Sequence, residues 1–387
     1  MKVVPARHLK GEFAIPGDKS ISHRYAILAG FASGVTRISH YSTSRDCQAT
    51  LNCLRPLGLE IQHFDNEVEI KSAGWREIQN PSNVLNAENS GTTIRLLSAL
   101  LSSRPILSTI SGDESLNQRP MARIIRPLTK MGAQIQARMQ QFPPLTIRGA
   151  DLRSIRYEPP VASAQVKSCV LLAGLTAEGT TVVIEKTPSR DHTERALPLF
   201  GAAFEKEGNE LRVTGRRPLR GVDVNVPGDF SSAVFFIVAA LLLPESSITL
   251  KQVGVNPSRT ALLELLEQAG APFEKSSQQS DFDEPRCDLT IRHSDRFLAD
   301  FPSEIPRHYI PNLIDEIPIL AVLGTRLKNG LSVRGASELR KKESDRIKAI
   351  VENLRAIGIT VDEAKDGFDI SPGQTIKGGL VRTFGDH

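Results

Sequence analysis

The chain has 387 residues, of which 40% are hydrophobic and 24% charged, and its formal net charge is +4. This length is comfortable for two domains, and the composition is ordinary for a soluble protein with a buried core. No apolar run approaches the length that crosses a bilayer, and a mild charge with 5% aromatic residues argues against a nucleic-acid binder.

The N-terminus and the cysteines indicate the compartment. Residues 1–5 carry no apolar secretory core and no Arg/Ser-rich transit segment, so we expect a cytoplasmic protein. The four cysteines, Cys47, Cys53, Cys169 and Cys287, are scattered and form no metal-type pair. We expect buried thiols in a reducing compartment and no metal site.

The first predicted helix begins with basic residues. Lys19, Ser20 and Arg24 follow a Pro-Gly turn and fall on the first coils of a helical pattern that continues over 25–31. The start of a helix already carries about half a positive charge, so cations there cost stability unless an anion lies between them. The segment predicts a phosphate or carboxylate site. The alternative is a solvated helix start whose cations point away.

Two later segments offer similar chemistry. Residues 89–93 precede an apolar helix over 94–101, and Gly91 allows a ligand to approach the backbone, although ordinary capping explains the segment equally well. Arg119 precedes a proline that suits the first position of a helix, so we expect Arg119 beside a helix start as an anion ligand. A surface arginine that pairs with nothing is the alternative.

The third such region has two helix starts. Residues 163–168 open an apolar helix, and their short hydroxyl and amide side chains suit the hydroxyls of a sugar-like ligand, or else a helix cap. Arg190 lies in a Ser-Arg-Asp-His segment and offers a further cation at a helix entrance. We expect His192 to be structural rather than catalytic.

The last chemistry-bearing residues lie in the C-terminal half. Asp315 lies within an apolar run over 313–323, so we expect a carboxylate that is half-buried with a partner or faces a cleft, suited to acid–base work. Lys342, Glu343 and Arg346 share one predicted helix start, with the two cations on one face. The alternative is an intrahelical ladder of salt bridges.

These segments belong to a repeated unit. An apolar helix, a strand, a Ser/Arg/Asp helix start and a second helix that closes at glycine recur five times, and the closing glycines are Gly58, Gly132, Gly201, Gly270 and Gly358. Alternating strands and helices in units of about 70 residues predict α/β repeats in which helices pack against sheets. The alternative is that unrelated α/β segments merely share a helix-Gly-strand pattern, but this explains the recurring Ser/Arg/Asp helix start less well.

The last three residues, 385–387, follow a strand-like stretch and should open the first helix of a sixth copy. We therefore expect a truncated sixth repeat that lacks about 40 residues, an uncovered apolar face and poor stability near this end.

Several cofactor motifs are absent from the sequence. It contains no Walker phosphate loop, dinucleotide glycine fingerprint, nucleophile elbow or zinc-binding helix motif. We therefore expect no nucleotide, nicotinamide or metal cofactor.

Taken together, these segments resemble the 5-enolpyruvylshikimate-3-phosphate synthase family over nearly the whole chain. The most specific stretches are 16–24, 89–96, 115–121, 163–167, 189–194, 314–320 and 342–346. The resemblance implies an inside-out α/β barrel of two domains with three βαβαββ-type repeats each, closing over a cleft. We expect a shikimate 3-phosphate-side domain over 17–227 and a second domain from 1–16 plus 228–387.

The implied reaction moves the enolpyruvyl group of phosphoenolpyruvate to the 5-hydroxyl of shikimate 3-phosphate and releases phosphate, in aromatic amino acid biosynthesis. By resemblance, shikimate 3-phosphate is held by Lys19, Ser20, Arg24, Ser163, Ala164, Gln165, Arg190, Asp315 and Lys342. Phosphoenolpyruvate meets Lys19, Gly91, Arg119, Gln165 and Arg346. Asp315 accepts the hydroxyl proton, Glu343 handles the proton at the methylene carbon, and Lys19 is the third catalytic residue. Two polyanionic substrates need concentrated cations together with an acid and a base.

The sequence also departs from the family pattern. Ala164 stands where many relatives have serine, so one phosphate contact rests on the backbone. The family's arginine after the Gly-Asp-His segment and a later lysine, which approach phosphoenolpyruvate, lie outside the chain. We therefore expect this form to be weakly active or inactive. We also expect the protein to be monomeric.

Two other functions remain open at this stage. The first is that of the UDP-N-acetylglucosamine enolpyruvyl transferases, which share the fold but typically carry a reactive cysteine in a flexible loop. The second is a non-catalytic anion-binding scaffold, against which the acid–base pair Asp315 and Glu343 argues.

Overall fold

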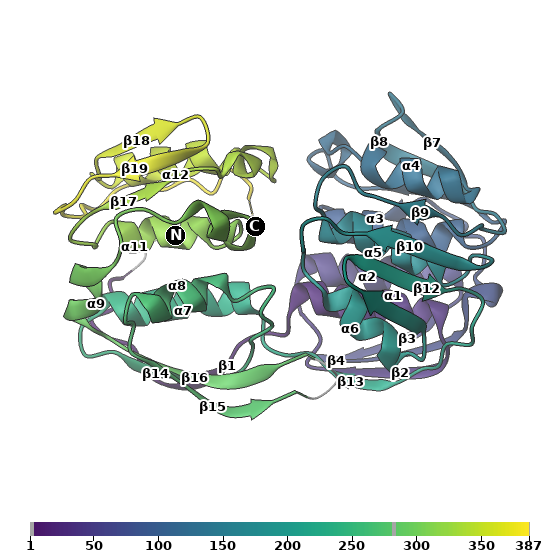
Figure 1. Cartoon of the computed structure of the whole chain (residues 1–387), viewed down its shortest axis with the longest axis horizontal. Helices are drawn as coiled ribbons and strands as arrows, with labels where there is room; N and C mark the ends of the chain where they lie inside the picture. Colours follow the sequence, from purple (N-terminus) through teal and green to yellow (C-terminus); the bar gives the residue numbers. More distant parts are fainter. Residues whose placement is uncertain (1–3, 281–283, 387) are drawn as a thin grey trace. The chain divides into compact units, whose positions relative to one another are not determined.

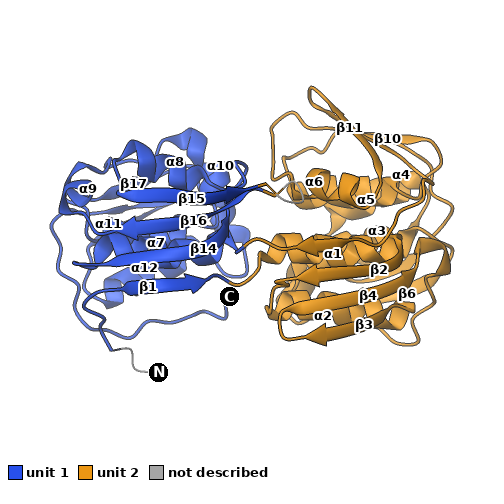
Figure 2. Cartoon of the chain, turned by 90° about the horizontal axis from the view of Figure 1, so that it is seen from below, with its two compact units in different colours: residues 1–15, 228–279, 285–387 blue, residues 16–227, 280–284 orange. Residues whose placement is uncertain are grey.

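The structure, a computed structural model, describes residues 4–280 and 284–386 of the chain. The chain divides into two compact units (Figure 2). Unit 1 comprises residues 1–15, 228–279 and 285–387, and unit 2 comprises residues 16–227 and 280–284. Among the described residues, no helix has the length and apolar character that spanning a membrane requires.

Unit 2 contains three four-stranded sheets within the described ranges, each with one parallel and two antiparallel strand pairs (Figure 1). The first has the order β13 (Asp223–Asn225), β2 (Ser33–Ser39), β4 (Glu67–Ala73), β3 (Glu60–Phe64). The second has the order β5 (Leu85–Asn86), β6 (Leu107–Ser111), β8 (Phe142–Arg148), β7 (Gln134–Arg138). The third has the order β11 (Ala203–Glu207), β12 (Glu210–Thr214), β10 (Thr180–Ile184), β9 (Arg156–Tyr157).

Each sheet of unit 2 is accompanied by two helices. They are α1 (Lys19–Phe31) and α2 (Arg45–Leu54), α3 (Gly91–Ser102) and α4 (Ala122–Met131), and α5 (Ala164–Gly174) and α6 (His192–Leu199). In the second and third copies the chain order is strand, helix, strand, helix, strand, strand. This is the βαβαββ repeat that the family resemblance implies.

Unit 1 contains two sheets among the described residues. One has the order β1 (Lys10–Ala14), β14 (Ser247–Gly254), β16 (Arg286–Arg292), β15 (Phe273–Gln279), and the other β17 (Leu331–Val333), β19 (Gly367–Ile370), β18 (Val361–Ala364). The helices are α7 (Phe230–Leu242), α8 (Ala261–Gln268), α9 (Asp295–Asp300), α10 (Ile310–Leu313), α11 (Ile317–Gly324) and α12 (Arg346–Ala356). The fourth strand of the second sheet is reduced to a parallel bridge between Glu304 and Ser332.

The two units exchange their first strands. Strand β1 precedes α1 in the chain but pairs with β14 of unit 1, and β13 precedes α7 but pairs with β2 of unit 2. The chain therefore passes between the units at 15–16 and again at 227–228, and the short stretch 280–284 also belongs to unit 2. Sequence neighbours such as β1 and α1 consequently belong to different cores.

The five closing glycines all adopt the left-handed backbone region that favours glycine. Gly58, Gly132, Gly201, Gly270 and Gly358 have φ angles of 94°, 120°, 81°, 76° and 87°. Each ends a helix and turns the chain into the next strand, which confirms the sequence interpretation of these positions.

The strand-like stretch expected before Gly385 does not form a strand within the described residues up to 386. The backbone of this segment instead bonds to helix α12: Lys377 N donates to Ile357 O over 2.8 Å, and Arg382 N donates to Asn353 Oδ1 over 2.8 Å. These helix groups satisfy part of the backbone that a sheet would otherwise pair. His387 lies outside the described residues.

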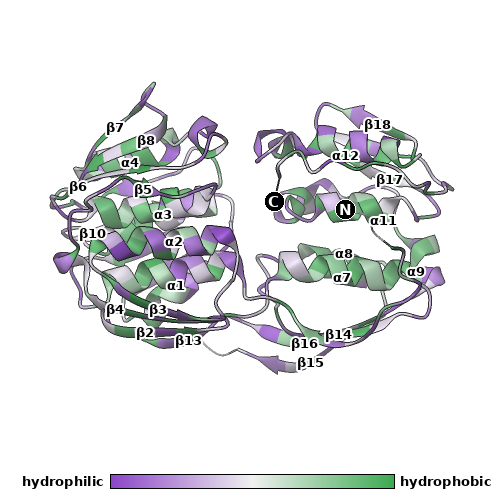
Figure 3. Cartoon of the chain, turned by 180° about the vertical axis from the view of Figure 1, so that it is seen from behind, coloured by the Kyte–Doolittle hydropathy of each residue, from purple (hydrophilic) through white to green (hydrophobic). Residues whose placement is uncertain are grey.

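The core of each unit is built on its apolar helices. Figure 3 shows hydrophobic residues concentrated along helices such as α7 and α11, which supply much of the core of unit 1. In unit 2, α3 packs against both α1 and α5, and its residues from Ile94 onward are largely buried. Phe235 and Phe236 on α7 and Val322 on α11 remain exposed by 57%, 40% and 41%.

A polar chain runs through the helical core of unit 2. His23 on α1 is fully buried, and its Nδ1 lies 2.7 Å from Thr50 Oγ1 on α2. Thr50 Oγ1 in turn lies 2.7 Å from Thr93 Oγ1 on α3. Burial is the largest influence on the imidazole and lowers the pKa of His23 from 6.5 to about 3. The histidine is therefore neutral in the folded protein near pH 7.

This buried histidine predicts a pH dependence of stability. The unfolded chain binds a proton at His23 below pH 6.5 and the folded chain only near pH 3, so His23 lowers the free energy of unfolding as pH falls through that window. The slope is about 1.4 kcal/mol per pH unit within the window. We expect His23→Asn to be destabilised at pH 7 but to lose less stability than the parent between pH 6.5 and 4, as measured by urea unfolding at each pH. Parallel curves for parent and variant would contradict this assignment.

Candidate active site

The cations predicted at the start of α1 lie there. Asp18 caps the helix, since its Oδ1 accepts a hydrogen bond from Ile21 N over 2.9 Å. Lys19 is on the first turn, and its Nζ lies 3.1 Å from Asp46 Oδ2 at the start of α2. The side chain of Lys19 is still 37% exposed. A carboxylate of the protein thus compensates a cation at the positive end of the helix.

Arg24 is turned into the protein rather than outward. It is 3% exposed, and it donates to Ser20 O over 2.8 Å, to Thr193 Oγ1 over 2.7 Å and to Ser168 Oγ over 3.1 Å. Burial, opposed by Glu194, lowers the pKa of Arg24 to about 10, so the guanidinium stays charged at neutral pH. Arg24 joins the start of α1 to α5 and α6.

Gly91, Arg119 and Gln165 lie close together although they come from different segments. A Cβ atom at Gly91 would lie 3.3 Å from Arg119 Nη1 and 2.9 Å from Arg95 Nη1. Arg95 Nη1 donates to Gln165 Oε1 over 2.5 Å, and Gln165 Nε2 donates to Thr92 Oγ1 over 3.0 Å. Arg95 therefore belongs to this cluster. Sequence reasoning did not single it out, although it lies one helical turn after Gly91.

Arg119 does not stand at a helix start, contrary to the expectation. Helix α4 begins at Ala122 with Met121 as its cap, and Arg119 instead ends a short 3₁₀ helix over Leu116–Gln118. At the cap, Met121 N donates to Gln141 O over 2.6 Å. Arg119 Nη2 donates to Asn89 Oδ1 over 2.7 Å, so the side chain remains beside the start of α3.

Ser163, Ala164 and Gln165 open α5 as predicted. Ser163 is the cap, and its Oγ accepts from Val166 N over 3.4 Å. Arg190 precedes α6, which starts at His192. The imidazole of His192 is 2% exposed and lies 2.8 Å from Glu284 Oε1, a buried pairing that suits the structural role expected of it.

A buried cation lies between these two segments. Lys167 on α5 is 1% exposed, and its Nζ lies 2.6 Å from Glu194 Oε1 and 2.7 Å from Glu185 Oε1. Burial raises the pKa of Glu194, and the attraction of Lys167 opposes that rise. Sequence reasoning gave none of the three residues a role, although Lys167 and Glu194 lie within the stretches 163–167 and 189–194 that carry the resemblance.

Unit 1 carries the second cluster, around Asp315. This residue lies in the junction between α10 and α11, and its Oδ1 is 3.0 Å from Lys342 Nζ and 3.6 Å from Arg346 Nη1. Glu343 Oε2 lies 2.9 Å from Arg346 Nη2. The side chain of Asp315 is one-quarter exposed and has partners. This matches the first of the two expected settings, a half-buried carboxylate with a partner.

The helix start expected at 342–346 begins later than predicted. Asp345 is the cap of α12 and accepts from Lys348 N over 3.1 Å, so Arg346 is the first helical residue. Lys342 and Glu343 precede the helix, and the argument that Lys342 and Arg346 share a helical face is wrong. Asp315 brings the two cations together instead.

Arg346 has a further carboxylate partner that the sequence did not indicate. Asp386 accepts from Arg346 Nε and Nη2 over 2.9 Å each, and it accepts from Ser344 Oγ over 2.7 Å. Burial alone would lower the pKa of Arg346, but Asp386, Glu343 and Asp315 outweigh it and raise that pKa. Arg346 is thus held by acidic groups from three segments.

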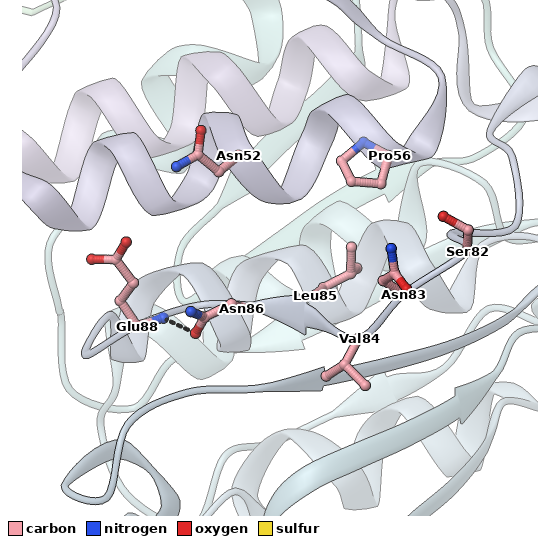
Figure 4. Close-up of a pocket in the computed structure, with 8 residues that line it drawn as sticks. All are labelled: Asn52, Pro56, Ser82, Asn83, Val84, Leu85, Asn86 and Glu88. Carbon is pink, nitrogen blue, oxygen red and sulfur yellow. Dashed lines mark hydrogen bonds between the residues drawn. The ribbon is translucent and has the colours of Figure 1, made fainter.

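Unit 2 also has a surface hollow, and its lining differs in composition from the two clusters of charged residues described above (Figure 4). It is lined by Asn52, Pro56, Ser82, Asn83, Val84, Leu85, Asn86 and Glu88, and Glu88 N donates to Asn86 Oδ1 over 2.9 Å. Its one charged residue is a glutamate, so the hollow does not suit a polyanionic ligand. Over 4–280 and 284–386, no group of three His, Cys, Asp or Glu residues is arranged to hold a metal ion.

Repeated βαβαββ sheets in two units, with cations at helix starts and a carboxylate held by lysine and arginine, define a two-domain inside-out α/β protein whose cation clusters suit polyanionic ligands. Residues 3–387 match the family described as EPSP synthase (3-phosphoshikimate 1-carboxyvinyltransferase), and the chain belongs to that family.

The similar proteins support the same assignment. The chain is 47% identical over 386 residues to the 3-phosphoshikimate 1-carboxyvinyltransferase of Solibacter usitatus, covering 100% of this chain and 90% of that protein. It is 45% identical over 389 residues to that of Bacillus velezensis, again covering 100% and 90%. The EPSP synthase structure from Acinetobacter baumannii superposes with a TM-score of 0.84 at 40% identity, over 95% of this chain and 83% of that chain.

The chain is therefore an enzyme that transfers the enolpyruvyl group from phosphoenolpyruvate to shikimate 3-phosphate in aromatic amino acid biosynthesis. The UDP-N-acetylglucosamine transferase and scaffold alternatives are set aside. The matches run over all of this chain and 88–90% of the relatives' length, and they do not bear out the expectation of a weakly active form.

The cysteines offer a test of the chemistry. All four are buried free thiols, and burial raises the pKa of Cys47 and Cys53 to about 12, that of Cys287 to about 11 and that of Cys169 above its ordinary value. Because the thiolate is the reactive form, we expect no thiol to react with a disulfide reagent such as DTNB in the native enzyme, and four to react in guanidinium chloride. Rapid modification of one native thiol with loss of activity would contradict the view that cysteine takes no part in catalysis.

Proposed function

We propose that Asp315 is the general base of the reaction and accepts the proton of the 5-hydroxyl of shikimate 3-phosphate. The observation that carries this proposal is the placement of its carboxylate, 3.0 Å from Lys342 Nζ and 3.6 Å from Arg346 Nη1. Two cations fix the orientation of the carboxylate, and a base must be held within reach of its proton to be effective. Lys342 also contributes to the binding of shikimate 3-phosphate.

Glu343 handles the proton at the methylene carbon of the enolpyruvyl group. Its contact with Arg346 at 2.9 Å is supporting geometry, because Arg346 is assigned to the anionic phosphoenolpyruvate on which that carbon lies. Lys19 is the third catalytic group. It serves both substrates from the start of α1, where its side chain is 37% exposed and can exchange Asp46 for a ligand anion.

The remaining phosphoenolpyruvate contacts come from Gly91, Arg119 and Gln165. Gly91 leaves open the space in which a Cβ atom would approach Arg119 and Arg95, so an anion can reach both guanidinium groups. Gln165 lies against this group through Arg95 and thereby connects it to the shikimate 3-phosphate residues.

Shikimate 3-phosphate is bound through Ser20, Ser163, Ala164, Gln165 and Arg190. Helix α5 supports this role because its first turn offers backbone N–H groups to an anion, at Ala164 in particular. Arg24 contributes indirectly, because its buried guanidinium donates hydrogen bonds to α1, α5 and α6 and holds these helices together.

The enzyme's context is also a proposal. Four unpaired thiols suit a reducing compartment, so we place the enzyme in the cytoplasm. We propose that it acts as a monomer on its two small-molecule substrates, without a metal, a nucleic acid or a membrane. Residues 17–227 form the shikimate 3-phosphate side, and 1–16 plus 228–387 form the second domain.

The base assignment predicts the effect of Asp315→Asn. The amide keeps the size of the side chain but cannot accept the proton, so kcat should fall by about 10²-fold to 10⁴-fold, measured as phosphate release at saturating substrates. Asp362→Asn, an exposed acidic position on β18, is the matched control and should retain the parent kcat. A kcat of Asp315→Asn within threefold of the parent would remove Asp315 from the mechanism.

Because the two substrates are assigned to different residues, two arginine variants should each weaken the binding of a different substrate. Arg190→Ala should raise the Kd of shikimate 3-phosphate by roughly tenfold to a hundredfold, as expected for loss of a charge-assisted hydrogen bond, measured by calorimetry. Arg119→Ala should leave that Kd within about twofold and raise the KM of phosphoenolpyruvate by a comparable factor. The control is Arg123→Ala, on the exposed face of α4. Equal effects of both variants on both substrates would refute the division.

A further inference from the structure

The buried lysine of α5 is bound by three acceptors from two segments, the loop over 185–189 and helix α6. Lys167 Nζ contacts Glu194 Oε1 at 2.6 Å and Glu185 Oε1 at 2.7 Å, and it donates to Ser189 O over 3.2 Å. An ammonium has three donors and no acceptor, so these partners saturate it. A buried ammonium is tolerated only when it is paired and hydrogen-bonded in this way.

The carboxylate of Glu185 binds the segment that leads to Arg190. It follows strand β10 directly, and its Oε1 accepts from Ser189 N over 2.9 Å and from Ser189 Oγ over 2.5 Å, in addition to the contact with Lys167. The backbone N–H of Glu185 donates to Asn209 O over 2.8 Å. These bonds close residues 185–189 into a fixed loop that ends one residue before Arg190.

The other side of Lys167 is attached to the helix starts. Glu194 lies on the first turn of α6, and Thr193 beside it accepts from Arg24 Nε and lies 2.6 Å from Ser168 Oγ on α5. Lys167 and Ser168 are adjacent on α5, one turn after Ser163 and Ala164. The loop, α5 and α6 are thereby connected through one ammonium.

Stability alone is a weak reason for this arrangement. Burying one ammonium and two carboxylates carries a large desolvation cost, and apolar side chains of similar volume often stabilise a core better. The contacts instead have a geometric consequence. They fix the distance between the loop before Arg190 and the first turn of α5, and these are the two segments to which shikimate 3-phosphate is assigned.

We propose that Lys167 and Glu185 are positioning residues for shikimate 3-phosphate, holding the Arg190 loop against the first turn of α5. This inference rests on the proposed roles of Arg190 and Ser163. Neither Lys167 nor Glu185 needs to touch the substrate. They act by keeping the cation and the helix start at the separation that the substrate spans, where a shift of about 1 Å is costly.

The test measures shikimate 3-phosphate binding by calorimetry in Glu185→Gln and Ser189→Ala. The first removes the charge that attracts Lys167, and the second removes one loop bond and keeps the buried charges. We expect the Kd to rise about tenfold in Glu185→Gln and about threefold in Ser189→Ala, with kcat at saturating substrate and the KM of phosphoenolpyruvate within about twofold of the parent. A purely structural role would lower the melting temperature without this selective change in Kd.

The matched control is Glu210→Gln. Glu210 lies on β12 of the same sheet, its side chain is 19% exposed against 11% for Glu185, and it pairs with Arg212 at 2.7 Å. It should leave the Kd unchanged. The double variant Glu185→Gln/Arg190→Ala should bind no more weakly than Arg190→Ala alone, because the effect of Glu185 runs through Arg190.

The outcomes separate this proposal from the site assignment. If Arg190→Ala weakens binding while Glu185→Gln and Ser189→Ala do not, the positioning role is wrong and the site stands. If Arg190→Ala also leaves the Kd unchanged, the assigned site is wrong and the positioning role falls with it. Should Glu185→Gln fail to fold, Ser189→Ala decides: a parent-like Kd in that variant overturns the proposal.

Discussion

Cations that lie close together must be kept from repelling one another, and this constraint shapes both units. The protein meets it by giving its clustered cations carboxylates of its own. Lys19 is paired with Asp46, and Arg346 with Asp386. Where the pair is exposed, the contribution of the ion pair to stability is small and a ligand anion can replace the carboxylate. Where it is buried, as at Lys167, the pair is a fixed part of the framework.

The repeat could be predicted from the sequence because its signals are local. A closing glycine is required wherever a helix turns into a strand through a left-handed residue, and all five predicted positions have positive φ. Helix starts at Lys19 and Ala164 were predictable for the same reason, since Asp18 and Ser163 are caps that act over three residues.

The errors arose where a distant contact decides a local structure. Pro120 suggested a helix start, but the helix begins two residues later at Ala122, and its cap Met121 is bonded through N to Gln141 O. Lys342 and Arg346 were placed on one helix by their spacing, whereas Asp315, 27 residues before Lys342, is what joins them. Contacts such as Lys167 with Glu185 leave no periodic trace, so only the folded structure reveals them.

The exchange of first strands places two short connections between the units, each running from a strand of one unit to a helix of the other. Strand β1 belongs to the core of unit 1, yet the chain leaves it directly for the turn and the cations of α1 in unit 2. In the same way β13 closes unit 2 immediately before α7 opens in unit 1. Each connection is paired into a sheet on one side and into a capped helix on the other, since Asp18 and Asp229 cap the helices that follow. Lys19 therefore lies on a helix of unit 2 that directly follows a strand paired into the sheet of unit 1.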